Sequence, residues 1–242
     1  MWNWASILLV IGSYFLGGIP LQYLLGRLKG VDLRNEYDMH IGLFRKVGPA
    51  LGLIGVIGDI AKGIVPVLIA NLMGWDALVA GLAGLAVLIG QMWSVYNKFD
   101  GEKGNTTGIG MSLALAPRAA AVMVTCIAVG AFIRTIPRLL SKSQSTSEKL
   151  RFGGPPSNSL PIGMFVGFAM FPIATTAWFS TWFANQLSLP TTFVGVAMFV
   201  LIMLRRATSD IRKDFKSGGS KVKIVFTRLL LDRGSWEKPE QQ

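Results

Sequence analysis

The chain has 242 residues, of which 51% are hydrophobic and only 15% charged, and its formal net charge is +11. This composition argues against a soluble domain and favours an integral membrane protein. The single cysteine excludes a disulfide within the chain and a metal site built from cysteines.

Long uncharged runs predict transmembrane helices, because a helix needs about 20 apolar residues to cross the hydrocarbon core. Residues 1–26 carry no charge, and neither do residues 152–204. We therefore expect an all-α, polytopic transmembrane helix bundle of about seven segments, in which the first is a retained helix rather than a signal peptide. The apolar segments are, in chain order, Trp2–Gly26, Pro49–Trp75, Ala77–Asn97, Thr106–Pro117, Ala119–Ile133, Leu160–Gln186 and Pro190–Leu204.

The segment Thr106–Pro117 is too short for a full crossing, since a helix rises only about 1.5 Å per residue. Pro117 interrupts it, so we expect a half-helix. A polar loop, "FDGEKGNTTGIG" at residues 99–110, leads into this half-helix. Irregular backbone at membrane depth is tolerated where it is buried in protein or lines a wet cavity. The loop is therefore a candidate site.

The positions of Lys and Arg predict the orientation of the chain. They gather in residues 27–46, 98–104, 134–151 and 205–242, which the positive-inside rule assigns to the cytoplasm. We expect a multi-pass protein of the inner membrane, with the N-terminus outside and the C-terminus cytoplasmic. Residues 1–204 form one membrane domain in this interpretation, and 205–242 form a basic tail. The tail's "KVKIVFTRLLL" is suited to an anionic leaflet.

The glycine-rich loop has the composition of a phosphate site. Glycines let backbone N–H groups turn toward an anion, and the N-terminus of a half-helix adds the positive end of its dipole. Lys103 supplies a full charge, and Thr106 and Thr107 supply hydroxyl groups. An interfacial turn with a lysine reaching to water is the alternative.

Asp59 and Lys62 interrupt an apolar helix in "GDIAKG". They are three residues apart, so they share one helix face. Ionisable groups in a membrane segment are costly, and they are usually functional or paired. The pair therefore either serves the site or neutralises itself.

The basic segment after the first apolar run offers a second set of polar groups. Arg34 and Arg45 are candidates for phosphate binding, and Asp38 or the sole histidine, His40, for a base or hydrogen-bond donor. Because "IGLFR" follows His40, the His-x4-Asp pattern of a common class of lipid acyltransferases is absent.

Four short motifs in order resemble those of the bacterial acyl-phosphate-dependent glycerol-3-phosphate acyltransferase family. They are "GGIPLQYLLGRLKGVDLR" at 17–34, "GDIAKG" at 58–63, "GQMWSVYNKFDGEKGNTTGIG" at 90–110 and "RRATSDIR" at 205–212. The resemblance implies transfer of an acyl group from acyl phosphate to the 1-hydroxyl of glycerol 3-phosphate, which forms lysophosphatidic acid. It implies no acyl-CoA, metal or cofactor. Membrane lipids are also expected partners, whereas binding of nucleic acid is not expected.

Both substrates carry phosphate, so the cations at the inner boundary are expected to converge in one pocket. The catalytic candidates are Asp38, His40 and Lys103. The expected substrate-binding residues are Arg34, Arg45, Lys62, Gly101, Gly104, Thr106, Thr107, Arg206 and Arg212.

The chain departs from the family pattern at several site positions. Asp38 and His40 stand where the motif has Ser and Asn, Gln91 replaces a His, and Glu102 replaces a Gly. Asp38 and Glu102 add negative charge where phosphates should bind. One alternative is therefore a divergent paralogue that binds acyl phosphate or phospholipid without turnover. A small transporter, suggested by Asp59, Lys62 and the half-helix, is the other.

Overall fold

The computed structural model describes residues 3–34, 36, 38–140, 158–176, 189–209, 211–216 and 220–232. Within these ranges the regular elements are helices only, which confirms the all-α prediction. They are α1 (Trp4–Gly18), α2 (Leu21–Leu28), α3 (Met39–Lys46), α4 (Pro49–Leu72), α5 (Ala77–Met92), the 3-10 turn η1 (Val95–Asn97), α6 (Asn105–Leu115), α7 (Pro117–Leu140), α9 (Ser159–Ala174), α11 (Leu189–Thr208), α12 (Ile211–Lys216) and α13 (Lys221–Leu231). Residues 141–157 and 177–188, which include the end of the predicted segment Leu160–Gln186, lie outside the described residues.

Among the described residues, four helices are long and apolar enough to cross a membrane: α4, α5 with η1, α7 and α11. Helices α1 and α2, bent by 43° at their junction, make a fifth if they are counted as one span. The shorter apolar helix α9 lies in the sixth predicted segment. Each of the seven predicted apolar segments thus contains a helix, although seven complete spans are not confirmed.

The outer surface of the bundle is apolar. Leu8 and Ile11 on α1, Leu53 and Ile57 on α4 and Phe132 on α7 are all exposed. Such a surface would be unfavourable in water, whereas lipid tails accept it. The molecule therefore presents a lipid-facing exterior around a core formed mainly by α5, α6, α7, α9 and α11.

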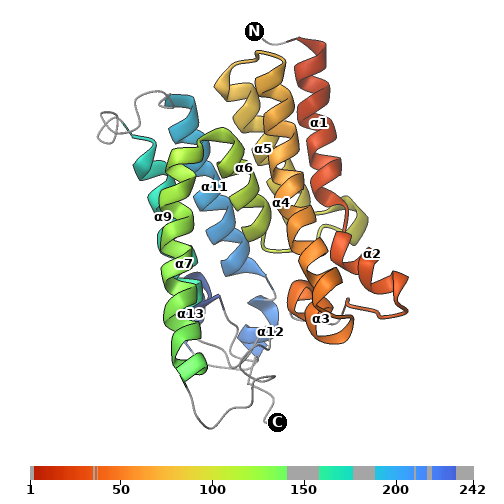
Figure 1. Cartoon of the computed structure of the whole chain (residues 1–242), viewed down its shortest axis with the longest axis vertical. Coiled ribbons are helices and arrows are strands. Elements are labelled where there is room, and N and C mark those ends of the chain that lie inside the picture. The colour runs from red at the N-terminus through yellow and green to blue at the C-terminus, as the bar shows by residue number, and fades with distance from the viewer. Residues whose placement is uncertain are drawn as a thin grey trace.

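The half-helix predicted from the sequence is present and lies beside α4 (Figure 1). Gly104, in the left-handed region at φ 76°, precedes α6, and Pro117 opens α7 two residues after α6 ends. A Cβ atom on Gly63 would lie 2.3 Å from the Thr107 carbonyl oxygen, and one on Gly110 would lie 2.1 Å from the Ile60 carbonyl oxygen. Glycine lets the two backbones meet, as small residues do between membrane helices.

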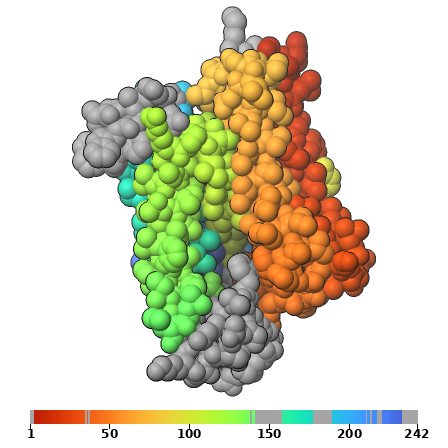
Figure 2. Space-filling model, in the orientation of Figure 1, coloured from red at the N-terminus to blue at the C-terminus, as the bar shows by residue number. Residues whose placement is uncertain are grey.

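Helices α2 and α3 form a separate small layer at one end of the bundle (Figures 1 and 2). The Asp38 side chain caps α3, since its Oδ1 accepts hydrogen bonds from the backbone N–H groups of His40 and Ile41. The buried side chains of Leu25, Leu33 and Leu43 hold this layer together. The cap and this apolar contact place the first turn of α3 over α4.

Candidate functional site

A cluster of polar side chains lies between the α2–α3 layer and the bundle. It is called the polar cluster below. Its members are Gln22 of α2, His40 of α3, Asp59 and Lys62 of α4, Gln91 of α5 and Glu102 of the glycine-rich loop.

Asp59 is the centre of the polar cluster and is completely buried. Its Oδ1 accepts a hydrogen bond from Lys62 Nζ at 2.9 Å. Its Oδ2 accepts one from Gln22 Nε2 at 2.6 Å and one from Gln91 Nε2 at 2.7 Å. Since a buried carboxylate is costly unless it is paired and hydrogen-bonded, these donors stabilise its charge. The predicted pairing of Asp59 with Lys62 is thus observed, within a larger network.

His40 lies between two carboxylates. Its Nε2 is 3.2 Å from Asp59 Oδ2 and 3.2 Å from Glu102 Oε2. Burial alone would lower the pKa of His40, but the hydrogen bonds to Asp59 and Glu102 outweigh it and raise this pKa to about 11. Burial raises the pKa of Glu102, and the nearby Asp59 raises it further. His40 is therefore a cation at neutral pH, which does not suit it to the predicted alternative role of a base.

The glycine-rich loop is held by backbone contacts and by Arg205. The N–H groups of Gly101 and Glu102 donate to the carbonyl oxygens of Met92 and Gln91, at 3.1 and 3.0 Å. Arg205 Nη2 donates to the Gly101 carbonyl oxygen at 2.5 Å and to Asp100 Oδ1 at 2.6 Å. The N–H groups of Gly101 and Glu102 are therefore engaged within the protein rather than turned toward an anion site.

Thr107 and Thr106 occupy the first turn of α6. Thr107 is buried, and its hydroxyl donates to the Asp59 carbonyl oxygen at 3.1 Å. Thr106 and Gly104 lie next to it, half-buried and buried respectively. The predicted loop thus packs directly on the helix turn that carries Asp59.

The predicted cations do not all converge. Arg34 is exposed, and its Nη2 lies 2.6 Å from Asp32 Oδ2. That guanidinium lowers the pKa of Asp32 to about 2. Lys103 Nζ lies 3.1 Å from Asp232 Oδ1, beyond the end of α13. Arg34 and Lys103 therefore have different partners, and neither lines the pocket described below.

The other predicted arginines are spread over the same end of the molecule. Arg206 is buried, and its Nη2 donates to Asn105 Oδ1 at 3.2 Å. Arg45, in the last turn of α3, and Arg212 of α12 are exposed. The structure thus brings His40 and Lys62 together, and it leaves Arg34, Arg45 and Arg212 at the surface.

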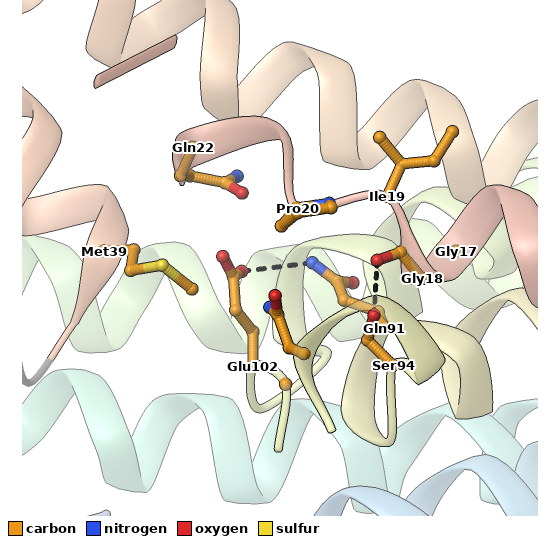
Figure 3. Close-up of a pocket in the computed structure, with 11 residues that line it drawn as sticks. Gly17, Gly18, Ile19, Pro20, Gln22, Met39, Gln91, Ser94 and Glu102 are labelled. Carbon is orange, nitrogen blue, oxygen red and sulfur yellow. Dashed lines mark hydrogen bonds between the residues drawn. The ribbon is translucent and has the colours of Figure 1, made fainter. Parts of the chain in front are cut away.

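A narrow pocket opens beside the polar cluster, with Glu102 and Gln91 pointing toward each other inside it (Figure 3). Its free volume is about 10 Å³, roughly enough for one water molecule. Two buried acceptors next to it, Gln91 Oε1 and Glu102 Oε1, have no hydrogen-bond partner among the described residues. Buried polar atoms normally have partners, so a hydrogen-bond donor such as water or a hydroxyl group would suit these two atoms. The lining residues are Gly17, Gly18, Ile19, Pro20, Gln22, Met39, Gln91, Ser94, Asn97, Gly101 and Glu102.

The atoms of His40, Asp59 and Glu102 that could coordinate a metal ion, one from each residue, lie within 4.8 Å of one another. Asp59 Oδ2 is also shared by two amide donors and His40. In this arrangement the three side chains are paired with one another, since His40 Nε2 lies 3.2 Å from both carboxylates.

Sequence reasoning missed three residues that shape this site. Gln22 is an amide in an otherwise apolar helical run, which was the available signal for it. Arg205 clamps the glycine-rich loop, although Arg206 was selected instead. Asp232, in the tail, had no local signal at all. Gln91 and Glu102 were visible only as departures from the motif.

Comparisons with known proteins agree with this architecture. A profile described as Glycerol-3-phosphate acyltransferase matches residues 7–217. A Glycerol-3-phosphate acyltransferase of Trichlorobacter lovleyi is 40% identical over 136 residues, which cover 53% of this chain and 70% of that protein. Glycerol-3-phosphate acyltransferase 4 of Dehalococcoides mccartyi is 27% identical over 235 residues, which cover 94% of this chain and 88% of that protein.

A crystal structure of PlsY, an integral membrane glycerol 3-phosphate acyltransferase, shares the fold with a TM-score of 0.64 and 23% identity. The alignment covers 92% of this chain and 99% of PlsY. The likeness supports a multi-pass membrane protein. With the profile matching most of its length, the chain belongs to the glycerol-3-phosphate acyltransferase family.

Proposed function

We propose that this protein transfers a fatty acyl group from acyl phosphate to the 1-hydroxyl of glycerol 3-phosphate, and so forms lysophosphatidic acid. The match of the family profile to residues 7–217 carries this proposal. PlsY, which has the same fold, has been solved in a glycerol 3-phosphate form and in a lysophosphatidic acid form. The lipid-facing exterior supports it as well, because an acyl chain can remain in the bilayer while its phosphate reaches the polar end of the bundle.

The polar cluster is the proposed site for glycerol 3-phosphate. Gln91 Oε1 and Glu102 Oε1 are buried acceptors without donors, and they suit the hydroxyl groups of a small polyol. His40 and Lys62 supply positive charge beside them. Because the open volume is only about 10 Å³, the α2–α3 layer has to move outward to admit this substrate.

Asp38 is the proposed base, in place of His40. The substrate hydroxyl oxygen attacks the acyl carbonyl carbon, the carbon–oxygen bond to phosphate breaks, and inorganic phosphate leaves. The hydroxyl proton passes to the Asp38 carboxylate, which is close enough to the polar cluster to raise the pKa of both His40 and Glu102. His40, as a cation, stabilises the negative charge that develops during attack.

The remaining predicted residues are proposed to hold the acyl phosphate. Lys103 provides the main charge after it separates from Asp232, and Gly101, Gly104, Thr106 and Thr107 shape the loop around it. Arg34, Arg45 and Arg212 are proposed to form a basic rim, and buried Arg206 supports the loop through Asn105 at the start of α6. Arg34, Arg45 and Arg212 are exposed, so they can turn toward a ligand.

We also propose that the N-terminus lies outside the cell and that the polar end of the bundle faces the cytoplasm. The glycine-rich loop, the end of α11 with Arg205 and the α2–α3 layer occur at this end. These are segments that the positive-inside rule assigns to the cytoplasm. The membrane domain is then 1–204, and the basic tail 205–242 is cytoplasmic.

Phosphate release tests this function. Purified protein in detergent or nanodiscs, given a long-chain acyl phosphate and glycerol 3-phosphate, should release phosphate only when both are present. Lys103→Ala should abolish acyl-phosphate binding, whereas Lys29→Ala, which changes an exposed lysine of the same charge, should not. Acyl-phosphate binding without phosphate release would instead support the non-catalytic paralogue. Counterflow of a solute in liposomes would support the transporter.

A further inference from the structure

Helix α13 lies beyond the part of the chain that the family profile matches, which ends at residue 217. It packs against α11 and α9. Its inner face buries Ile224 and Arg228. Arg228 donates to the Asp214 carboxylate of α12 and to the Ser209 carbonyl oxygen. Helix α13 thus contacts the bundle through its inner face, and its outer face is left without a partner among the described residues.

The C-terminal end of α13 reaches the candidate site. Asp232, the residue after the helix, places its Oδ1 3.1 Å from Lys103 Nζ. Only 17% of the Lys103 side chain and 15% of the Asp232 side chain are exposed, so the pair is largely withdrawn from water. The Asp232 carboxylate is therefore paired with the Lys103 amine, which is proposed to bind the phosphate of a substrate.

The outer face of α13 is apolar and has a lysine on each side. At 3.6 residues per turn, Val222, Phe226 and Leu229 fall on one face. They line an apolar groove, and Val222 and Phe226 are 79% and 62% exposed. Lys221 and Lys223 lie about 100° to either side of Val222 by the same helical geometry. This is the pattern of a helix that lies in the surface of an anionic membrane.

We infer that α13 binds an anionic bilayer surface through this face and, when bound, holds Asp232 on Lys103. The two lysines complement anionic headgroups, while the exposed side chains of Val222 and Phe226 enter the boundary between headgroups and acyl chains. Since Asp232 and a substrate phosphate compete for one amine, anionic lipid weakens phosphate binding. This last step rests on the proposed function: the enzyme makes an anionic lipid, and the anionic charge of its own membrane lowers its affinity for the phosphate substrate.

The membrane contact can be tested without any turnover. The full chain with Cys126→Ser and Phe226→Cys carries a fluorophore on α13 and is reconstituted with nitroxide-labelled lipids. Quenching should be strong in bilayers containing phosphatidylglycerol and weak in phosphatidylcholine alone. A label at Thr227→Cys, on a different face, should be quenched little in either. Equal quenching in both bilayers would overturn the anionic preference. A shielded label that lipid does not quench would indicate a protein partner, such as a second copy of the chain, and would overturn the membrane contact.

The effect on the site has its own test. The apparent KM for the phosphate substrates should rise about tenfold from phosphatidylcholine to phosphatidylglycerol nanodiscs, as two surface lysines would allow. Asp232→Asn should lower this KM and remove its dependence on lipid, with kcat unchanged. The double variant Lys221→Glu, Lys223→Glu should also lower this KM and remove its dependence on lipid. If the KM of Asp232→Asn still depends on lipid, simple repulsion between the membrane and the substrate explains that dependence. The proposed competition between Asp232 and substrate phosphate for Lys103 is then refuted.

Discussion

Replacing Asp59 with Asn is the most direct perturbation of the polar cluster. Asn keeps the shape of the side chain and one acceptor oxygen, so the variant removes charge without making a cavity. Lys62 then loses the carboxylate that it contacts at 2.9 Å, and His40 keeps only Glu102 of its two carboxylate partners. Breaking a buried ion pair by removing one partner costs about 3–5 kcal/mol, and we expect a loss of that size in the free energy of unfolding.

Reversible unfolding in detergent micelles by added SDS measures this loss. The matched control is Asp32→Asn, which removes an exposed carboxylate paired with Arg34 and should leave the free energy of unfolding unchanged within error. A double-mutant cycle with Lys62→Met should show strong coupling, because the two single changes remove the same pair. If Asp59→Asn unfolds no more easily than Asp32→Asn, the polar cluster does not hold the fold together, and this reasoning is wrong.

Three further predictions concern neighbouring features. His40 has a folded-state pKa of about 11, above the ordinary 6.5, so its stabilising effect is complete below pH 6.5 and is lost as pH rises toward 11. The Tm of the protein should therefore fall between pH 6.5 and 11. The Tm of the His40→Gln variant should fall less over the same range. Gly110→Ala places a Cβ 2.1 Å from the Ile60 carbonyl oxygen and should cost about 1–3 kcal/mol in SDS unfolding, whereas Gly12→Ala meets nothing within 4 Å and should cost far less. Asp38→Ser should lower kcat in the phosphate-release assay, since it removes the proposed base, and a higher kcat would refute that role.

The helices were predictable because their signals are local. Charge-free runs exceed the thickness of a bilayer, and Pro117 separates α6 from α7 within a few residues of the polar loop. Asp59 and Lys62, three residues apart, had to share a helix face. The number of complete spans was less predictable, because α1 and α2 are bent at their junction and α9 is short.

The site was less predictable because its contacts join distant parts of the chain. Lys103 meets Asp232 across 129 positions, and Arg205 meets Gly101 across 104. Charge alone suggested that Lys103 and Arg34 would converge on phosphate, yet Arg34 is paired with Asp32 and Lys103 with Asp232, in different parts of the chain. The replaced motif residues His40, Gln91 and Glu102 gave no sign in the sequence that they contact one another. In the structure Glu102 contacts both His40 and Gln91, so the three replacements belong to one network.

The narrowness of the pocket has a kinetic consequence. With room for about one water, the proposed glycerol 3-phosphate site accepts its substrate only from a conformer in which α3 has separated from Glu102 and Asp59. Measured affinity is then the intrinsic affinity multiplied by the population of that open conformer. Variants that loosen α3 should bind glycerol 3-phosphate more tightly while they unfold more readily, so that tighter binding and greater stability oppose each other in this enzyme.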